Sequence, residues 1–147
     1  MRYPIRSLVA LALLACITSC AHRPKEGAHP AVDAHSLVGP TWAWSGTVTP
    51  VEVLTPADPA SYTFQLSSDG HAAVRADCNR GSCSYTLSGS ELRFGPMALT
   101  RAMCAEGSLD TRFAQQLGGA AHTFWSGDTL MIDLIADSGT MRFLPAR

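Results

Sequence analysis

The chain has few charged residues and no excess of basic ones. Of its 147 residues, 16% are Asp, Glu, Lys or Arg, and the formal net charge is −1. Proteins that bind nucleic acid usually carry a basic patch, which releases counterions from the phosphates. A basic amphipathic helix that would bind lipid headgroups is also missing. The composition therefore argues against nucleic acid as a partner and against membrane binding by charge.

The short motifs of common enzyme classes are absent as well. The sequence has no Gly-x-Ser-x-Gly, no His-Glu-x-x-His and no glycine loop of the phosphate-binding type. Only His71 and His122 fall within the predicted domain, both in strand-like contexts, and the carboxylates are scattered, mostly at predicted turns and strand edges. We therefore expect a protein that is not an enzyme and has no cofactor.

No apolar run approaches the ~20 residues that a membrane-spanning helix needs. The run at residues 8–17 is preceded by Arg2 and Arg6 and followed by the small residues Thr18 and Ser19. A basic start, a short apolar core and small residues at the end are typical of a secretory signal peptide. We expect residues 1–19 to be removed on export.

The end of this signal peptide resembles the lipobox of bacterial lipoproteins. Residues 17–20 read Ile-Thr-Ser-Cys. The resemblance implies a diacylglycerol thioether on Cys20, cleavage just before it, and acyl chains such as palmitate that attach the protein lastingly to a membrane. Ordinary signal-peptide cleavage after Ser19-Cys20-Ala21, which also fits a small-x-small site, is the alternative. Ala21 favours the outer over the inner membrane of the cell envelope. The expected partner is therefore that membrane, and the lipid anchor makes the contact.

The rest of the chain divides into a tether and one domain. Residues 20–36 lack apolar periodicity and are rich in Ala, Pro and His, which is typical of a flexible linker. Residues 37–147 alternate apolar and polar side chains over short segments, such as Tyr62 to Leu66, separated by turn signals such as Asp69-Gly70. This pattern predicts short antiparallel strands within a single domain.

One segment follows a helical period instead. Leu109, Phe113 and Leu117 recur every four residues, between a predicted N-cap at Ser108 and a predicted C-cap at Gly118. The domain is therefore predicted to be α+β and rich in β-structure. We expect a curved antiparallel sheet or partial barrel of about seven to eight strands, with one helix packed on it.

Two segments that do not follow the strand pattern carry a family resemblance. Residues 77–85 include Cys78, the chain's only asparagine (Asn79) and Tyr85, and residues 99–104 include a threonine, a methionine and a cysteine. The chain resembles the META domain family, which includes the heat-shock protein HslJ, from about residue 37 to residue 144. The residues that match the family motifs are Cys78, Asn79, Tyr85, Thr100, Met103 and Cys104.

This resemblance implies a function in the cell envelope without catalysis. The family is associated with stress responses and with tolerance of the antibiotic novobiocin. In physical terms, we expect a rigid β-rich surface that binds an envelope protein or a small ligand. Trp42, Trp44 and Trp125 would be natural anchors if exposed, because aromatic residues dominate interface energetics. The alternative for these tryptophans is packing in the core.

The family pattern also implies a disulfide between Cys78 and Cys104, which suits an oxidising compartment. Such a bond would stabilise the domain by about 3 kcal/mol in the chain-entropy model. Cys83 departs from the family, which usually has a small residue there, and would then be a buried thiol. A Cys78–Cys83 disulfide and a zinc site of three thiolates remain open as alternatives.

A second functional reading is a periplasm-facing inhibitor of a hydrolase such as lysozyme. Small lipoproteins of that kind share the size, the tether and the cellular address of this chain. They lack the paired cysteine motifs, so the META-type reading is preferred.

Overall fold

The structure is a computed structural model that describes residues 37–146. The predicted signal peptide (1–19) and the predicted tether (20–36), with Cys20, lie outside the described residues. The described part of the chain contains ten strands and one complete α-helix, α2 (Asp110–Gly118). The strands are β1 (Thr41–Val48), β2 (Val53–Leu54), β3 (Tyr62–Leu66), β4 (His71–Ala76), β5 (Asn79–Ser88), β6 (Glu91–Phe94), β7 (Ala98–Leu99), β8 (Ala120–Ser126), β9 (Thr129–Leu134) and β10 (Thr140–Pro145).

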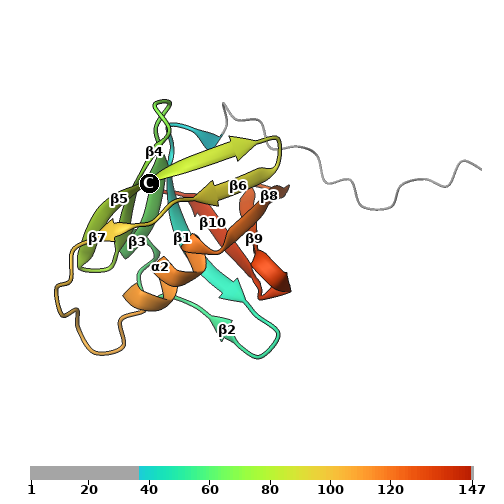
Figure 1. Ribbon diagram of the computed structural model, residues 1–147. Helices are drawn as coiled ribbons and strands as arrows, with labels where there is room; N and C mark the ends of the chain where they lie inside the picture. Colours follow the sequence, from blue (N-terminus) through green and yellow to red (C-terminus); the bar gives the residue numbers. More distant parts are fainter. Residues whose placement is uncertain (1–36, 147) are drawn as a thin grey trace, which may run out of the picture.

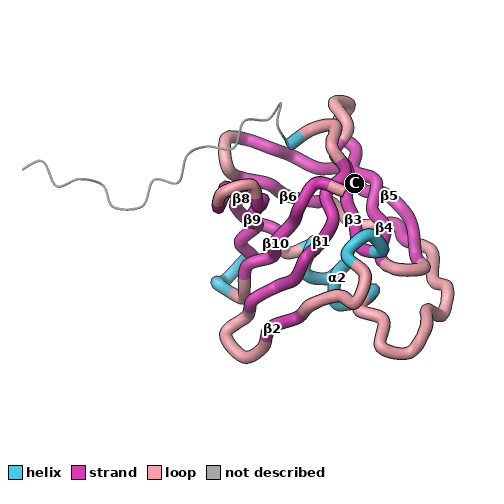
Figure 2. The backbone as a smooth tube through the Cα atoms, turned by 180° about the vertical axis from the view of Figure 1, so that it is seen from behind, coloured by secondary structure: helices cyan, strands magenta, loops and turns pink. Residues whose placement is uncertain are grey.

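Eight of these strands close into an antiparallel barrel. They follow the order β10-β9-β8-β6-β5-β4-β3-β1, and β10 pairs back with β1 along residues 42–48. β2 and β7 are two-residue additions that pair with β1 and β5. Figures 1 and 2 show the barrel from opposite sides. The β-rich antiparallel domain with one helix is confirmed, and the expected curved sheet or partial barrel is a closed barrel, because the first and last strands pair.

The alternating side chains of the strands form the core as predicted. In β3, Tyr62, Phe64 and Leu66 are all buried, and the Asp69-Gly70 turn leads into β4. Alternation places every second side chain on the inner face of the barrel, where the apolar members pack together. The buried residues Trp44, Phe64, Phe113 and Phe143 contribute aromatic rings to this core.

The tryptophans belong to this core and do not form an exposed anchor. Trp42 and Trp44 are buried, and each indole N–H donates a hydrogen bond, to the Leu37 carbonyl and to the Thr47 hydroxyl (both 3.0 Å). Trp125 packs against Trp42 with ring centroids 5.5 Å apart. Buried indoles with satisfied N–H groups are typical of core packing, so of the two alternatives core packing holds for Trp42 and Trp44.

Helix α2 packs its apolar side against the barrel. Phe113 and Leu117 are fully buried, and the Phe113 ring lies 5.3 Å from that of Trp44. The Ser108 hydroxyl accepts a hydrogen bond from the Asp110 N–H (3.2 Å), although the residue in the N-cap position is Leu109. The predicted helix is therefore present with its ends displaced by one residue. No helix within residues 37–146 is long and apolar enough to cross a membrane.

Candidate functional site

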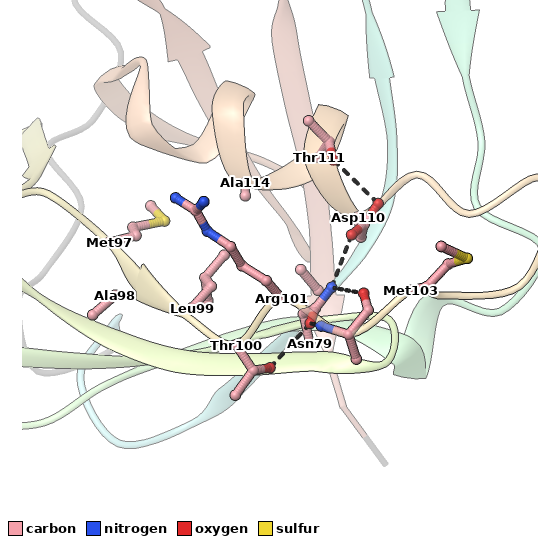
Figure 3. A pocket seen from close by; sticks show the side chains of 12 residues that line it. Asn79, Met97, Ala98, Leu99, Thr100, Arg101, Met103, Asp110, Thr111 and Ala114 are labelled. Atoms are coloured by element: carbon pink, nitrogen blue, oxygen red, sulfur yellow. Dashed lines mark hydrogen bonds between the residues drawn. The ribbon is translucent and has the colours of Figure 1, made fainter.

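Asn79 connects three elements at the start of β5. Its side chain is 4% exposed, and its Oδ1 accepts hydrogen bonds from the Ala102 N–H (2.8 Å) and the Thr100 hydroxyl (3.0 Å). Its Nδ2 donates to Asp110 Oδ2 (2.9 Å) and to the Ala102 carbonyl (3.2 Å). One buried amide thus uses both its donors and its acceptor to hold the segment 100–104 and the first turn of α2 (Figure 3).

A disulfide joins the same elements next to Asn79. Cys78 and Cys104 are bonded, with their Cα atoms 5.5 Å apart, which confirms the predicted pairing. Neither the Cys78–Cys83 disulfide nor the three-thiolate zinc site is formed, because Cys83 is free and buried elsewhere on β5. Among the described residues, no group of three potential ligands could hold a metal ion.

The other family-motif residues have separate positions. The Thr100 hydroxyl also accepts a hydrogen bond from the Arg80 N–H (3.0 Å), so Thr100 belongs with the Asn79 cluster. Tyr85 lies further along β5, where its hydroxyl donates to the Ser67 carbonyl (2.8 Å) and so braces the β3–β4 turn. Burial and the nearby Asp69 raise the pKa of Tyr85. Met103 is fully exposed.

A groove with a volume of about 690 Å³ lies beside this cluster. One wall is the segment 97–103 and the opposite wall is the first half of α2, while Ala76 and Asn79 also line it. Ala98, Ala102 and Ala114 leave room because their side chains are small. We call this the Arg101 groove. The sequence alone does not indicate this groove, because alanines carry no motif and the two walls come from separate segments.

The charges of the Arg101 groove are not balanced. Asp110 forms no ion pair with Arg101, and its carboxylate accepts hydrogen bonds from the Asn79 amide and the Thr111 hydroxyl (3.3 Å). Arg101, in contrast, has no hydrogen-bond or ion-pair partner among residues 37–146. Figure 3 shows its side chain lying across the groove towards Ala114. The groove, whose lining is both polar and apolar, therefore presents one positive charge that no described residue pairs with.

Neither domain histidine lines this groove. His71 is exposed and lies 3.5 Å from Asp69 on the β3–β4 turn, and His122 is exposed on β8. The groove can therefore offer apolar contacts, a guanidinium and backbone groups. These features are suited to binding.

The strand β7 reaches its position because residue 81 is a glycine. A Cβ atom built on Gly81 would lie 1.8 Å from the Ala98 carbonyl oxygen, well inside van der Waals contact. β7 therefore lies directly against β5, pairing through Gly81 with Leu99 and through Ser82 with Ala98. A side chain at residue 81 would push this wall of the groove outward.

Cys83 is expected to react slowly with thiol reagents in the folded protein. Its side chain is buried, and burial raises the pKa of the thiol above its ordinary value of 9.0, so little reactive thiolate is present. In the mature chain with Cys20→Ser, Ellman's reagent should label one thiol rapidly after unfolding without reductant. Rapid labelling of the folded protein, or no label after unfolding, would contradict the assignment.

Solved structures share this fold. A protein from Burkholderia xenovorans studied by NMR is 22% identical, covers 99% of this chain and 97% of its own length, and has a TM-score of 0.64. A second NMR structure is 22% identical, covers 77% and 95%, and has a TM-score of 0.58. A DUF4847 family protein from Bacteroides vulgatus is 9% identical, covers 75% and 94%, and has a TM-score of 0.54. At these identities the likeness shows the fold alone.

No curated protein matches the chain. The META domain family, in contrast, matches residues 36–147, which include every residue of the barrel, α2 and the Arg101 groove. The chain belongs to the META domain family.

Proposed function

We propose that this META domain protein is a non-enzymatic binding protein of the bacterial cell envelope, with a role in tolerance of stress or antibiotics. A lipid on Cys20 anchors it to a membrane, the outer membrane in preference to the inner. The Arg101 groove binds an envelope partner. The observation that carries this proposal is a groove whose walls are held by a disulfide and a buried amide, while its arginine has no partner within the described part of the chain.

The rigidity of the groove supports binding. The barrel has its own core, yet a buried amide and a disulfide both act on the segment 100–104, which lies outside the barrel strands. A preformed surface loses less conformational entropy when it binds a partner. The same segment exposes Met103 completely, and methionine adapts well to varied apolar partners.

The proposed anchor places this groove close to the bilayer. The predicted tether over residues 21–36 would have a root-mean-square reach of about 20 Å, estimated as ~5–6 Å times the square root of its length. With several acyl chains at Cys20, the attachment is lasting. The domain therefore meets partners that lie on or near the membrane surface.

Capture of partners from cell envelopes tests the proposal. A C-terminally tagged protein is crosslinked in cells and purified next to Arg101→Glu and Arg80→Glu variants. Arg80 is an exposed arginine of the same strand pair that does not line the groove, so it provides a matched control. We expect the unaltered protein and Arg80→Glu to recover one shared partner, and Arg101→Glu to lose it.

Two results would contradict the proposal. Recovery of nothing above an untagged control would count against binding, and equal recovery by all three proteins would count against the groove. A Cys20→Ser form reports on the anchor separately. It should lose metabolic labelling with palmitate and move to the soluble fraction, and labelling that persists would refute lipidation at Cys20.

The projecting segment between β7 and α2 favours a second candidate, inhibition of a hydrolase. Figure 1 shows this segment extending away from the barrel, and it carries exposed Met103 next to a disulfide. A rigid projection of this kind is suited to entering a substrate cleft. Inhibition of lysozyme by the purified mature chain would support this candidate, and no inhibition at micromolar protein would remove it.

A further inference from the structure

The wall of the Arg101 groove is a strand with one unpaired edge. The Thr100 N–H donates to the Arg80 carbonyl (2.9 Å), and the Ala102 N–H donates to Asn79 Oδ1 (2.8 Å). Successive residues of an extended chain direct their N–H and C=O groups to opposite sides. Because Thr100 and Ala102 bond on the side of β5, the backbone groups of Leu99 and Arg101 point away from β5.

The groove lies along this unpaired edge. β7 has β5 on one side, and α2 lies across the groove on the other (Figure 3). An added strand would lie ~4.8 Å from β7. The volume of about 690 Å³ falls within the ~300–1,000 Å³ typical of ligand sites, which leaves room for a short extended segment.

The side chains around the edge define the chemistry of the segment. Met97 and Leu99 are partly buried against the core and offer apolar contacts, while the Arg101 guanidinium has no partner among residues 37–146. Asp110 is held by Asn79 and Thr111 and forms no ion pair with Arg101, which leaves the guanidinium available to a carboxylate of a partner. Charge complementarity then calls for a carboxylate beside apolar side chains.

A second groove, between the β1–β2 turn and α2, lacks this combination. It has a volume of about 530 Å³ and is lined by apolar residues that include exposed Val51 and Ile135. Its cation, Arg112, already forms an ion pair with Glu52. Within the described residues, this groove therefore has no comparable charge to select a partner.

We propose that the Arg101 groove binds an extended acidic segment of a partner protein, which adds to the free edge of β7 as a further strand. The inference rests on the proposed binding function and specifies the partner's chemistry. Backbone hydrogen bonds to Leu99 and Arg101 supply affinity, and a Glu or Asp side chain that pairs with the Arg101 guanidinium supplies specificity. Apolar side chains of the segment contact Met97 and Leu99.

A random ten-residue peptide library displayed on phage provides the test. Selection uses the immobilised mature chain with Cys20→Ser, which keeps the whole folded domain. We expect enrichment of peptides that alternate apolar residues with a Glu or Asp. Arg101→Glu should weaken the binding of a selected peptide by about tenfold or more, and Arg80→Glu should leave it unchanged. Replacing the acidic residue of the peptide with lysine should restore binding to Arg101→Glu.

Amide hydrogen exchange locates the added strand. On binding the synthetic peptide, exchange at the Leu99 and Arg101 amides should slow by about tenfold or more, whereas the Thr100 amide, already bonded to Arg80, should change little. N-methylation of the peptide at the residues facing β7 should abolish binding, and methylation at the alternate residues should preserve it. Because Arg101 has no hydrogen-bond or ion-pair partner among residues 37–146, the amide spectrum of free Arg101→Glu should otherwise match that of the unaltered protein.

The outcomes separate this inference from the proposed function. Selected peptides that are not acidic, that bind Arg101→Glu equally, or that protect other amides overturn the strand addition. A small molecule that occupies the groove without protecting Leu99 and Arg101 overturns it as well. If capture still recovers an Arg101-dependent partner, the binding function stands while the strand addition fails. If neither capture nor selection yields a binder, both fail.

Discussion

An Asn79→Ala variant is expected to lose about 3 kcal/mol of unfolding free energy. The substitution removes five hydrogen bonds, to Thr100, Asp110, the Cys104 sulfur and twice to Ala102, from a side chain that is nearly fully buried. It also leaves the Ala102 N–H and the Asp110 carboxylate without these partners, and unsatisfied polar groups cost more than the bonds themselves contribute. Urea denaturation of the mature chain with Cys20→Ser measures the loss.

Two further variants show whether the loss comes from the amide. Thr100→Val removes hydrogen bonds of the Thr100 hydroxyl but keeps Asn79, and it should cost about 1 kcal/mol. Asn79→Asp places a second carboxylate against Asp110, so burial and repulsion should raise the pKa of the new carboxyl. A carboxyl whose pKa is raised in the folded state destabilises the fold once it ionises. The loss of unfolding free energy in Asn79→Asp, relative to the unaltered protein, should therefore grow as the pH rises above ~4.

The stabilising role of the Asn79 amide is refuted if the unfolding free energies of Asn79→Ala and the unaltered protein differ by less than about 1 kcal/mol, because ordinary substitutions produce differences of that size. It is also refuted if Asn79→Asp becomes more stable relative to the unaltered protein as the pH rises. That result would mean that Asp110 does not face residue 79. In both cases the groove wall would depend on the disulfide alone.

Removal of the disulfide should have an effect of similar size. The Cys78–Cys104 bond spans a sequence separation of 26, and a loop of this size is worth about 3 kcal/mol in the chain-entropy model. A Cys78→Ser/Cys104→Ser double variant should therefore unfold at a lower urea concentration. Cys83→Ala serves as the matched control because it keeps the disulfide, and its loss should be clearly smaller. Unchanged stability of the double variant would show that the bond is not structural.

The contributions of the disulfide and of the Asn79 side chain to the unfolding free energy should also be coupled. Both hold the segment 100–104 against the start of β5, so releasing this segment weakens the hydrogen bonds of Asn79 as well. Asn79→Ala added to the double serine variant should cost less than Asn79→Ala alone, because residues in one network do not contribute additively. If Asn79→Ala costs the same with and without the disulfide, the two stabilise the segment independently.

Local pattern was sufficient to predict most elements of the barrel. Strands β3 and β4, the Asp69-Gly70 turn and the helix carrying Phe113 and Leu117 all lie where alternation, turn residues and helical period indicated. These signals arise from residues within a few positions of one another. Closure of the barrel is different, since Trp44 pairs with Phe143 across most of the domain, and no local period specifies such a partner.

The residues of the candidate site show the same division between what local sequence predicts and what the tertiary structure decides. The amino-acid sequence was enough to single out Cys78, Asn79, Thr100 and Cys104 through their resemblance to the META family motifs, and its residues 17–20 resemble a lipobox. The chain fold was needed to show that Met103 is exposed, that Trp42 and Trp44 are core residues, and that Arg101 has no partner among residues 37–146. Exposure and unpaired charge depend on every surrounding segment, and β7 and α2 form a groove only after the barrel brings them together.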